Sequence, residues 1–344
     1  MSHSISKPIW TPTFYGFLAL IFWGIAPVFV CKIRYLPVFQ LSMLFQGISF
    51  LFTLGLTIKQ KRLKIILKEL PKSFIMIPFL VVNQICYLYA FRLAPPDQVD
   101  LINYLWPIMT VVGSSFLFSE RMNLTRLVGI SVSFLAIMFL GREEILGAGL
   151  ESQFFWGYAL AFAAATLWTL YTLIGRSLKE VAAYQHIGFH VGISSIVMML
   201  LHLILDDGFV PMQFNDWVLV TSFGILVYGL GYPLWWFGIE KGCFSLLTSL
   251  SYLAPIISIL ALVISGVVDA SGDLAIACLM VTLGSWLVNQ GSPVIEKNLL
   301  DIITFANLSK NVEWNSWEAE LIKHDKWHKK KLLNRKIQKL FGWV

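Results

Sequence analysis

Charged residues are scarce in this chain of 344 residues. Asp, Glu, Lys and Arg make up 13% of it, against about 25% in an average soluble protein, while 57% of the residues are hydrophobic. A soluble domain of this length has too little interior to bury so much apolar surface, which excludes a cytosolic enzyme or a DNA-binding module. The apolar stretches are continuous rather than alternating with polar residues, which excludes an outer-membrane β-barrel.

Metal-ligating patterns are also missing. The four cysteines lie in or beside apolar runs without metal-ligand spacing, and we expect them to pack as small hydrophobic residues: Cys31, Cys86, Cys243 and Cys278. His186 and His190 are four residues apart, but they lack a third ligand and the glutamate of a zinc-protease helix, so we expect them at the membrane interface. We therefore predict no catalytic residue, no metal and no cofactor.

Ten apolar runs are long enough to suggest membrane-spanning helices, since a helix needs about 20 apolar residues to cross the hydrocarbon core. They cover Phe14–Cys31, Pro37–Ile58, Phe74–Phe91, Val99–Phe118, Leu124–Gly141, Phe154–Gly175, Ile187–Leu205, Trp217–Phe237, Phe244–Val268 and Leu274–Asn289. These runs predict an all-α membrane protein with ten transmembrane helices.

Lysine and arginine indicate the orientation, because basic loops stay on the cytoplasmic side of a membrane. With the N-terminus inside, 22 of the 26 Lys and Arg fall on the cytoplasmic side. Without the C-terminal tail the balance is still 12 against 4. We therefore expect both termini to be cytoplasmic, in a bacterial inner membrane.

The sequence contains an internal repeat. A shift of 148 residues aligns Tyr104-Leu-Trp-Pro-Ile108 with Tyr252-Leu-Ala-Pro-Ile256, and the match extends without a gap back to Tyr87 and Trp235. Each copy holds five spans, so the second copy must cross the membrane in the opposite direction. We divide the chain into an N-terminus 1–13, two inverted five-helix repeats 14–141 and 154–289, and a tail 290–344. Inverted repeats are typical of carriers.

Prolines mark equivalent points of the two repeats. A proline inside a helix removes a backbone donor and frees the carbonyl four residues earlier. Pro107 thus frees the carbonyl of Asn103, Pro255 that of Ser251, and Pro27 that of Trp23. Such carbonyls must face protein, water or a solute, which favours a central solute site. The alternative is a set of packing kinks relieved by neighbouring hydroxyl groups.

Aromatic residues lie near these breaks and in other spans. They would form a wall that stacks on planar groups or surrounds a cation, and they are Trp23, Tyr87, Tyr104, Trp106, Trp168 and Tyr252. Plain packing within the bundle is the alternative for each ring. No charged residue falls near the middle of a span, and we expect Asp97 and Asp100 at the outer mouth. The predicted site is therefore polar, aromatic and uncharged.

The ten spans in two inverted fives, with a proline-marked fourth and ninth helix, resemble the EamA-type branch of the drug/metabolite transporter superfamily. The resemblance covers about residues 12–290. The run Asn103–Pro107, Trp168 and the run Tyr252–Pro255 are most similar to bacterial aromatic amino acid exporters. The resemblance implies a monomeric bundle, or a weak homodimer, whose central cavity contains Tyr87, Tyr104, Trp106 and Trp168 with a hydroxyl group from Ser249 or Ser251.

Two regions depart from that pattern. The loop Ala94–Gln98 lacks the expected small-residue linker, and the tail 290–344 carries ten Lys and Arg. The tail has apolar residues at helical spacing, so we expect it to lie on the anionic inner leaflet rather than to bind nucleic acid. A solvated extension is the alternative.

These patterns predict a secondary transporter of small metabolites that works by alternating access. Amino acids, aromatic ones above all, are the leading cargo through the resemblance. Related carriers of obligate intracellular bacteria resemble this layout too, and some of them import S-adenosylmethionine in exchange for S-adenosylhomocysteine, which is the second hypothesis. A membrane enzyme acting on a lipid-linked substrate would need carboxylates, a histidine cluster or a metal site at one face. The pair Asp206–Asp207 has no such partners in its loop, so we expect no enzyme.

Overall fold

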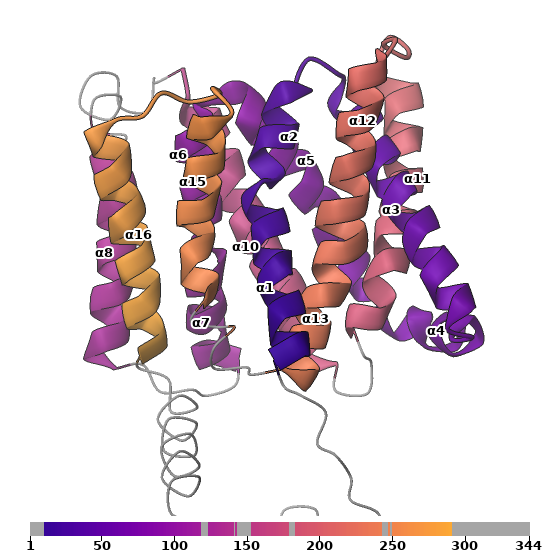
Figure 1. Ribbon diagram of the computed structural model, residues 1–344, viewed down its shortest axis with the longest axis horizontal. Coiled ribbons are helices and arrows are strands. Elements are labelled where there is room, and N and C mark those ends of the chain that lie inside the picture. The colour runs from indigo at the N-terminus through magenta and orange to yellow at the C-terminus, as the bar shows by residue number, and fades with distance from the viewer. Residues whose placement is uncertain are drawn as a thin grey trace, which may run out of the picture. The chain divides into compact units, whose positions relative to one another are not determined.

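The computed structural model describes residues 10–117, 123–140, 142, 153–178, 183–242, 247 and 250–290, and the elements in these ranges are helices (Figure 1). In chain order they are α1 (Trp10–Gly24), α2 (Ala26–Lys32), α3 (Val38–Lys59), α4 (Leu63–Glu69), η1 (Leu70–Met76), α5 (Ile77–Leu93), α6 (Pro96–Asn103), α7 (Trp106–Leu117), α8 (Leu124–Leu140), α10 (Phe155–Ser177), α11 (Ala183–Leu205), α12 (Phe214–Ser222), η3 (Phe223–Gly231), α13 (Tyr232–Lys241), η4 (Ser251–Leu253), α15 (Ala254–Ile264) and α16 (Gly272–Gln290).

The described helices account for the predicted spans. Six helical stretches are long and apolar enough to cross a membrane, and three shorter apolar helices match the predicted fifth, ninth and tenth spans. The predicted fourth span is divided between α6 and α7. Part of the predicted ninth span and all but the first residue of the predicted tail 290–344 lie outside the described residues. The expectation of an all-α membrane fold is confirmed.

The helix boundaries follow the 148-residue repeat. Shifting α7 gives 254–265, and α15 runs from Ala254 to Ile264; shifting α8 gives 272–288, and α16 begins at Gly272. The helices α8 and α16 also pack along each other. Ser133 Oγ donates to the carbonyl of Val281 over 3.5 Å, and these two residues are 148 positions apart. Equivalent residues of the two repeats therefore meet at this contact.

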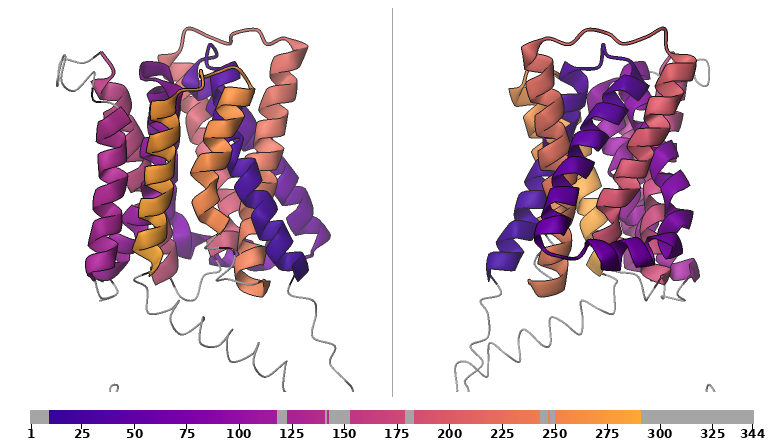
Figure 2. Two further views of the ribbon diagram at one scale, coloured as in Figure 1. Left: turned by 60° about the vertical axis from the view of Figure 1, so that its left-hand side comes forward. Right: turned by 90° about the vertical axis from the view of Figure 1, so that its right-hand side faces the viewer.

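The two repeats run in opposite directions. Shifting α3 by 148 residues gives 186–207, which is nearly the range of α11. In Figure 1, α3 leads into α4 at the lower end, whereas α11 leads into α12 at the upper end. Figure 2 shows the same connection above the bundle from two other sides. Equivalent connections thus lie at opposite ends, as an inverted repeat requires.

Prolines interrupt the helices where the sequence predicts it. Ile25 separates α1 from α2 before Pro27, and α6 ends at Asn103 while α7 begins at Trp106. The 3₁₀ turn η4 gives way to α15 next to Pro255. The helices α1, α2, α6 and α15 pack against one another, which brings the broken segments of the two repeats together.

One irregular helix was not predicted. The segment η3 is a π-helix of nine residues, between α12 and α13. Gly224 lies so close to α3 that an added Cβ would be 2.6 Å from the Phe45 carbonyl oxygen. Pro233, two residues after the end of η3, has no amide hydrogen to donate into the preceding turns. Wide π-helical turns are rare and occur often at functional sites.

The side chains of His186 and His190 are both fully buried within the bundle, and their expected position at the membrane interface stays a prediction. Ser73 Oγ donates to the Leu70 carbonyl and lies 2.9 Å from a ring nitrogen of each histidine. With its hydrogen used, Ser73 accepts from both rings. His190 Nδ1 is then left to accept from the hydroxyl of Tyr171, 2.9 Å away. The histidines therefore join α11 to η1 and α10.

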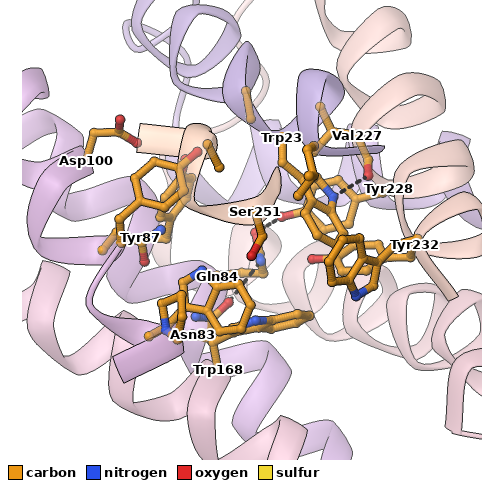
Figure 3. Close-up of a pocket in the computed structure, with 18 of the residues that line it drawn as sticks. Trp23, Asn83, Gln84, Tyr87, Asp100, Trp168, Val227, Tyr228, Tyr232 and Ser251 are labelled. Carbon is orange, nitrogen blue, oxygen red and sulfur yellow. Dashed lines mark hydrogen bonds between the residues drawn. The ribbon is translucent and has the colours of Figure 1, made fainter. Parts of the chain in front are cut away.

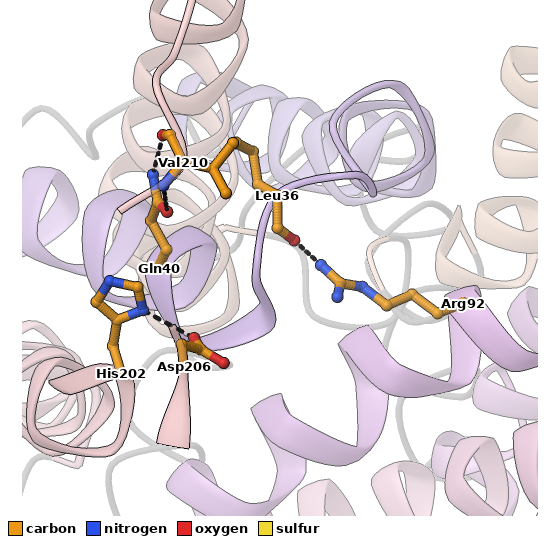
Figure 4. A network of polar contacts seen from close by, with 6 residues as sticks. All are labelled: Leu36, Gln40, Arg92, His202, Asp206 and Val210. Carbon is orange, nitrogen blue, oxygen red and sulfur yellow. Dashed lines mark hydrogen bonds and ion pairs between the residues drawn. The ribbon is translucent and has the colours of Figure 1, made fainter. Parts of the chain in front are cut away.

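A second polar network lies at the upper end of the bundle (Figure 4). The Gln40 amide donates to the Val210 carbonyl and accepts from the Val210 amide, both over 2.8 Å. His202 Nδ1 lies 2.7 Å from the carboxylate of Asp206, one turn further along the chain. Arg92 donates to the Leu36 carbonyl. Asp206 is thus engaged in holding the end of α11.

Candidate solute-binding cavity

A cavity of about 120 Å³ lies where the broken helices meet. It is lined by Leu20, Trp23, Ala26, Asn83, Gln84, Tyr87, Asp100, Asn103, Tyr104, Trp106, Pro107, Trp168, Phe223, Val227, Tyr228, Tyr232, Trp235, Ser251 and Ala254. Figure 3 shows Tyr87 and Asn83 on one side, Trp23 and Tyr232 across from them, and Ser251 between. Both repeats contribute to the wall.

Most residues singled out from the sequence line this cavity. These are Trp23, Tyr87, Asn103, Tyr104, Trp106, Trp168 and Ser251, together with Pro107. Tyr252, Pro27 and Pro255 are described but do not line it. Ser249 lies outside the described residues. The structure therefore brings together residues that are up to 228 positions apart in the chain, from Trp23 to Ser251.

The aromatic wall is built from rings that support one another. Trp168 of α10 stacks on Tyr171 with ring centres 5.2 Å apart, and its edge meets Trp106 at 6.5 Å. Trp23 of α1 lies 5.3 Å from Tyr232 and 5.5 Å from Trp235. Rings in such tilted and edge-on pairs keep part of their faces free, because they do not stack fully on each other.

The π-helix η3 positions Trp23. The Trp23 indole nitrogen donates to the carbonyl of Val227 over 3.3 Å. A Cβ added to Gly231 would lie 2.8 Å from that indole nitrogen, so only glycine lets the ring approach. The wide helix also supplies Phe223, Val227 and Tyr228 to the cavity wall. We infer that the irregular segment shapes the site.

A chain of buried amides crosses the cavity wall. The hydroxyl of Tyr228 donates to Gln84 Oε1 over 2.7 Å, and Gln84 Nε2 donates to Asn83 Oδ1 over 3.1 Å. Asn83 Nδ2 then donates to the Ala164 carbonyl over 2.7 Å. This chain joins η3, α5 and α10, and it fixes the polar groups that face the cavity. The sequence signal for this chain of hydrogen bonds is the adjacent pair Asn83 and Gln84 within an apolar run.

The expectation that no acidic or basic side chain lies in the cavity is wrong. Asp100 lines it and is only 1% exposed, instead of lying at an outer mouth. Because α6 begins at Pro96, Asp100 falls one turn inside a helix that packs within the bundle. Among the described residues that line the cavity there is no Lys, Arg or His.

Sequence reasoning also missed several aromatic lining residues. Trp235 is the counterpart of Tyr87 under the 148-residue shift, and Tyr232 is the counterpart of Gln84. Applying the repeat to the candidate Tyr87 would have found Trp235, whereas Tyr232 could be found only from Gln84, which was not a candidate. Tyr228 gave no such signal, because its place in the cavity follows from the π-helix.

Comparisons with known proteins identify the family. The EamA-like transporter family matches residues 10–142 and 155–290. An aromatic amino acid exporter, YddG, of Ancylobacter novellus is 32% identical over 199 residues, which are 58% of this chain and 69% of the exporter. The exporter YddG of Salmonella typhimurium is 24% identical over 47% of this chain and 56% of its own length.

More distant comparisons agree. An uncharacterized transporter of Archaeoglobus fulgidus is 26% identical over 71% of this chain and 86% of its own length. A solved crystal structure has a TM-score of 0.65 and 26% identity, and covers 84% of this chain and all of its own. The predicted ten-helix fold with two repeats is thereby confirmed. The chain belongs to the EamA-like transporter family of the drug/metabolite transporter superfamily, and it is a multi-pass inner-membrane transporter of small metabolites, not an enzyme.

Proposed function

We propose that this transporter moves aromatic amino acids across the inner membrane by alternating access. The observation that carries the proposal is the aromatic cavity between two inverted repeats. Trp23, Trp106, Trp168 and Trp235 offer ring surface for a planar side chain. The names of the relatives from Ancylobacter novellus and Salmonella typhimurium support the same cargo and the export direction.

The polar part of the cavity suits the other end of an amino acid. Asn103 and Ser251 belong to equivalent positions of the two repeats and stand beside the helix breaks. Their side chains and the interrupted backbone supply hydrogen-bonding groups for a bound solute. Because the two halves have opposite orientation, rocking of one against the other would expose the same groups to either side of the membrane.

The basic residues set the proposed orientation. The connection from α3 through α4 to η1 carries six Lys and Arg, from Lys59 to Lys72, and we assign this end to the cytoplasm. Both termini would then be cytoplasmic. The basic tail would lie on the anionic inner leaflet, and the bundle would act as a monomer or weak homodimer.

A second cargo is favoured by one observation. Asp100 places a carboxyl group in a cavity whose described lining has no basic side chain. S-adenosylmethionine carries a sulfonium cation and an ammonium group beside a planar adenine ring, so aromatic faces and a carboxylate suit it. Exchange against S-adenosylhomocysteine is therefore the alternative to amino acid export.

Counterflow in proteoliposomes separates these cargoes. Vesicles containing the full chain are preloaded with unlabelled phenylalanine or S-adenosylmethionine, and uptake of the corresponding radiolabelled compound is measured. We expect phenylalanine to accumulate above the level in protein-free vesicles. Accumulation of S-adenosylmethionine alone would favour the alternative cargo. Uptake of neither compound, with a panel of other amino acids also negative, would contradict both.

A further inference from the structure

The carboxyl group of Asp100 is the least explained group of the cavity. Its side chain is 1% exposed, and its Oδ2 atom has no hydrogen-bond partner within the part of the chain that the structure describes. Buried charged groups are normally paired or hydrogen-bonded, since desolvation without compensation is costly. An ionisable residue inside a membrane bundle is a functional-site hypothesis on those grounds.

Neighbouring groups do not supply a counter-charge for Asp100. The hydroxyl of Ser258 on α15 is fully buried within hydrogen-bonding reach of Asp100 and Tyr104, but a neutral hydroxyl does not balance a carboxylate charge. The basic side chains at the same end of the bundle are exposed or bind other groups. Lys32 donates to the Ser265 carbonyl over 3.0 Å, and Arg92 donates to the Leu36 carbonyl. The carboxyl group thus lacks a resident cation in the described structure.

The surroundings of Asp100 favour an organic cation over a metal ion. No group of three or more potential metal ligands occurs within the described ranges. The cavity instead contains four tyrosine and four tryptophan rings, whose faces attract cations. A carboxylate backed by aromatic faces is a recognised way to hold a protonated amine, because the charge is met by hydrogen bonding and by ring quadrupoles together.

We propose that Asp100 binds the protonated amine of the transported solute, and that this group rather than the solute's carboxylate determines recognition. The inference deepens the proposed function and rests on the same cavity. A solute carboxylate would find no basic side chain among the described lining residues. A solute without its carboxylate should therefore bind almost as tightly. A solute without its amine should bind more weakly, because Asp100 is then buried without its partner.

Three compounds with one benzene ring test this assignment. Phenylalanine has both charges, phenethylamine has only the amine, and 3-phenylpropionate has only the carboxylate. Their binding to the purified full chain in detergent is measured by quenching of tryptophan fluorescence, since four tryptophans line the cavity. We expect phenethylamine to bind within about threefold of phenylalanine and 3-phenylpropionate to bind at least about tenfold more weakly. Equal affinity for 3-phenylpropionate and phenethylamine would overturn the assignment.

Variants locate the effect. Asp100→Asn should weaken phenethylamine binding at least about tenfold and leave 3-phenylpropionate unchanged or tighter. Asp97→Asn is the matched control, because Asp97 lies on the same helix but does not line the cavity. If Asp100→Asn does not fold, Asp100→Glu keeps the charge and should keep the preference for amines. Unchanged amine binding in Asp100→Asn, with only the pH dependence of flux altered, would assign Asp100 to a proton and contradict the proposal.

The result is separable from the proposed cargo. Loss of phenethylamine binding in Asp100→Asn, without phenylalanine counterflow in the wild type, would retain the amine site and reject aromatic amino acids. Phenylalanine counterflow that persists in Asp100→Asn, with no preference for amines in the binding series, would retain the cargo and reject the amine site.

Discussion

Two regions of the bundle use side-chain size in opposite ways. At the seam between α8 and α16, Gly129 and Gly284 let the helix backbones touch, and an added Cβ on Gly284 would lie 2.6 Å from the Gly129 carbonyl oxygen. Around the cavity, large rings such as Trp106 and Trp168 meet edge to face. Small residues therefore let the helices come close together at the seam, whereas large rings line the cavity.

The difference indicates separate roles for the two regions. Close backbone contact between small residues stabilises helix pairs in a membrane. Van der Waals packing matters there because the hydrophobic effect does not drive helices together in lipid. The seam joins the last helix of each repeat, and Ser133 there contacts its repeat counterpart Val281. We interpret the seam as the fixed junction of the two halves, and the cavity wall as the surface that changes during transport.

A bulky residue in the seam should have the largest effect. Gly284→Val adds a branched side chain whose Cβ alone would collide with Ser133 Oγ and lie 2.6 Å from the Gly129 carbonyl oxygen, so we expect loss of folded protein. Detergent-solubilised yield and size-exclusion chromatography measure this. Gly55→Ala is the control, since nothing lies within 4 Å of an added Cβ on Gly55. Normal yield of Gly284→Val would remove the distinction between seam and cavity.

Truncation in the cavity should affect transport instead of folding. We expect Trp106→Ala to abolish phenylalanine counterflow while the protein still inserts and elutes as the wild type does, because the ring lines the site without closing a helix contact of the seam. Trp156→Ala is the control and should keep normal counterflow, since Trp156 on α10 is 68% exposed and does not line the cavity. Full flux in Trp106→Ala would show that the ring serves packing alone.

The smallest effect should follow from loss of one hydroxyl group. Tyr228→Phe keeps the ring but removes the donor to Gln84 Oε1, leaving a buried acceptor without that bond at a cost of about 1–3 kcal/mol. We expect a lower thermal unfolding temperature and flux reduced only a few fold. Tyr15→Phe, on an exposed tyrosine of α1, should change neither. A complete loss of flux in Tyr228→Phe would place the hydroxyl in direct contact with the solute.

The sequence predicts those features that depend on local chemistry. Proline lacks an amide hydrogen in any surroundings, so the breaks before Pro27, Pro107 and Pro255 could be predicted from the sequence alone. The repeat likewise needs only alignment, and it already contained the pairing of Tyr87 with Trp235. Apolar runs of sufficient length defined the spans for the same reason.

Features that depend on distant partners could not be predicted. Asp100 looks interfacial in the sequence, because only the packing of α6 within the bundle sets its depth. His190 is buried through Ser73 and Tyr171, which are 117 and 19 residues away. The run of apolar residues and glycines in η3 has no residue pattern that distinguishes a π-helix from an α-helix. Such features follow from tertiary packing and not from local propensity.

Alternating exposure of the cavity can be tested most directly with one cysteine. Asn103→Cys, in a chain whose four native cysteines are replaced, is treated with a membrane-impermeant maleimide in right-side-out and in inside-out vesicles. We predict labelling from both sides, slowed by phenylalanine in each case, because Asn103 lines the cavity at a helix break. Labelling from one side only, at a rate that phenylalanine does not change, would contradict a central site that opens to both faces.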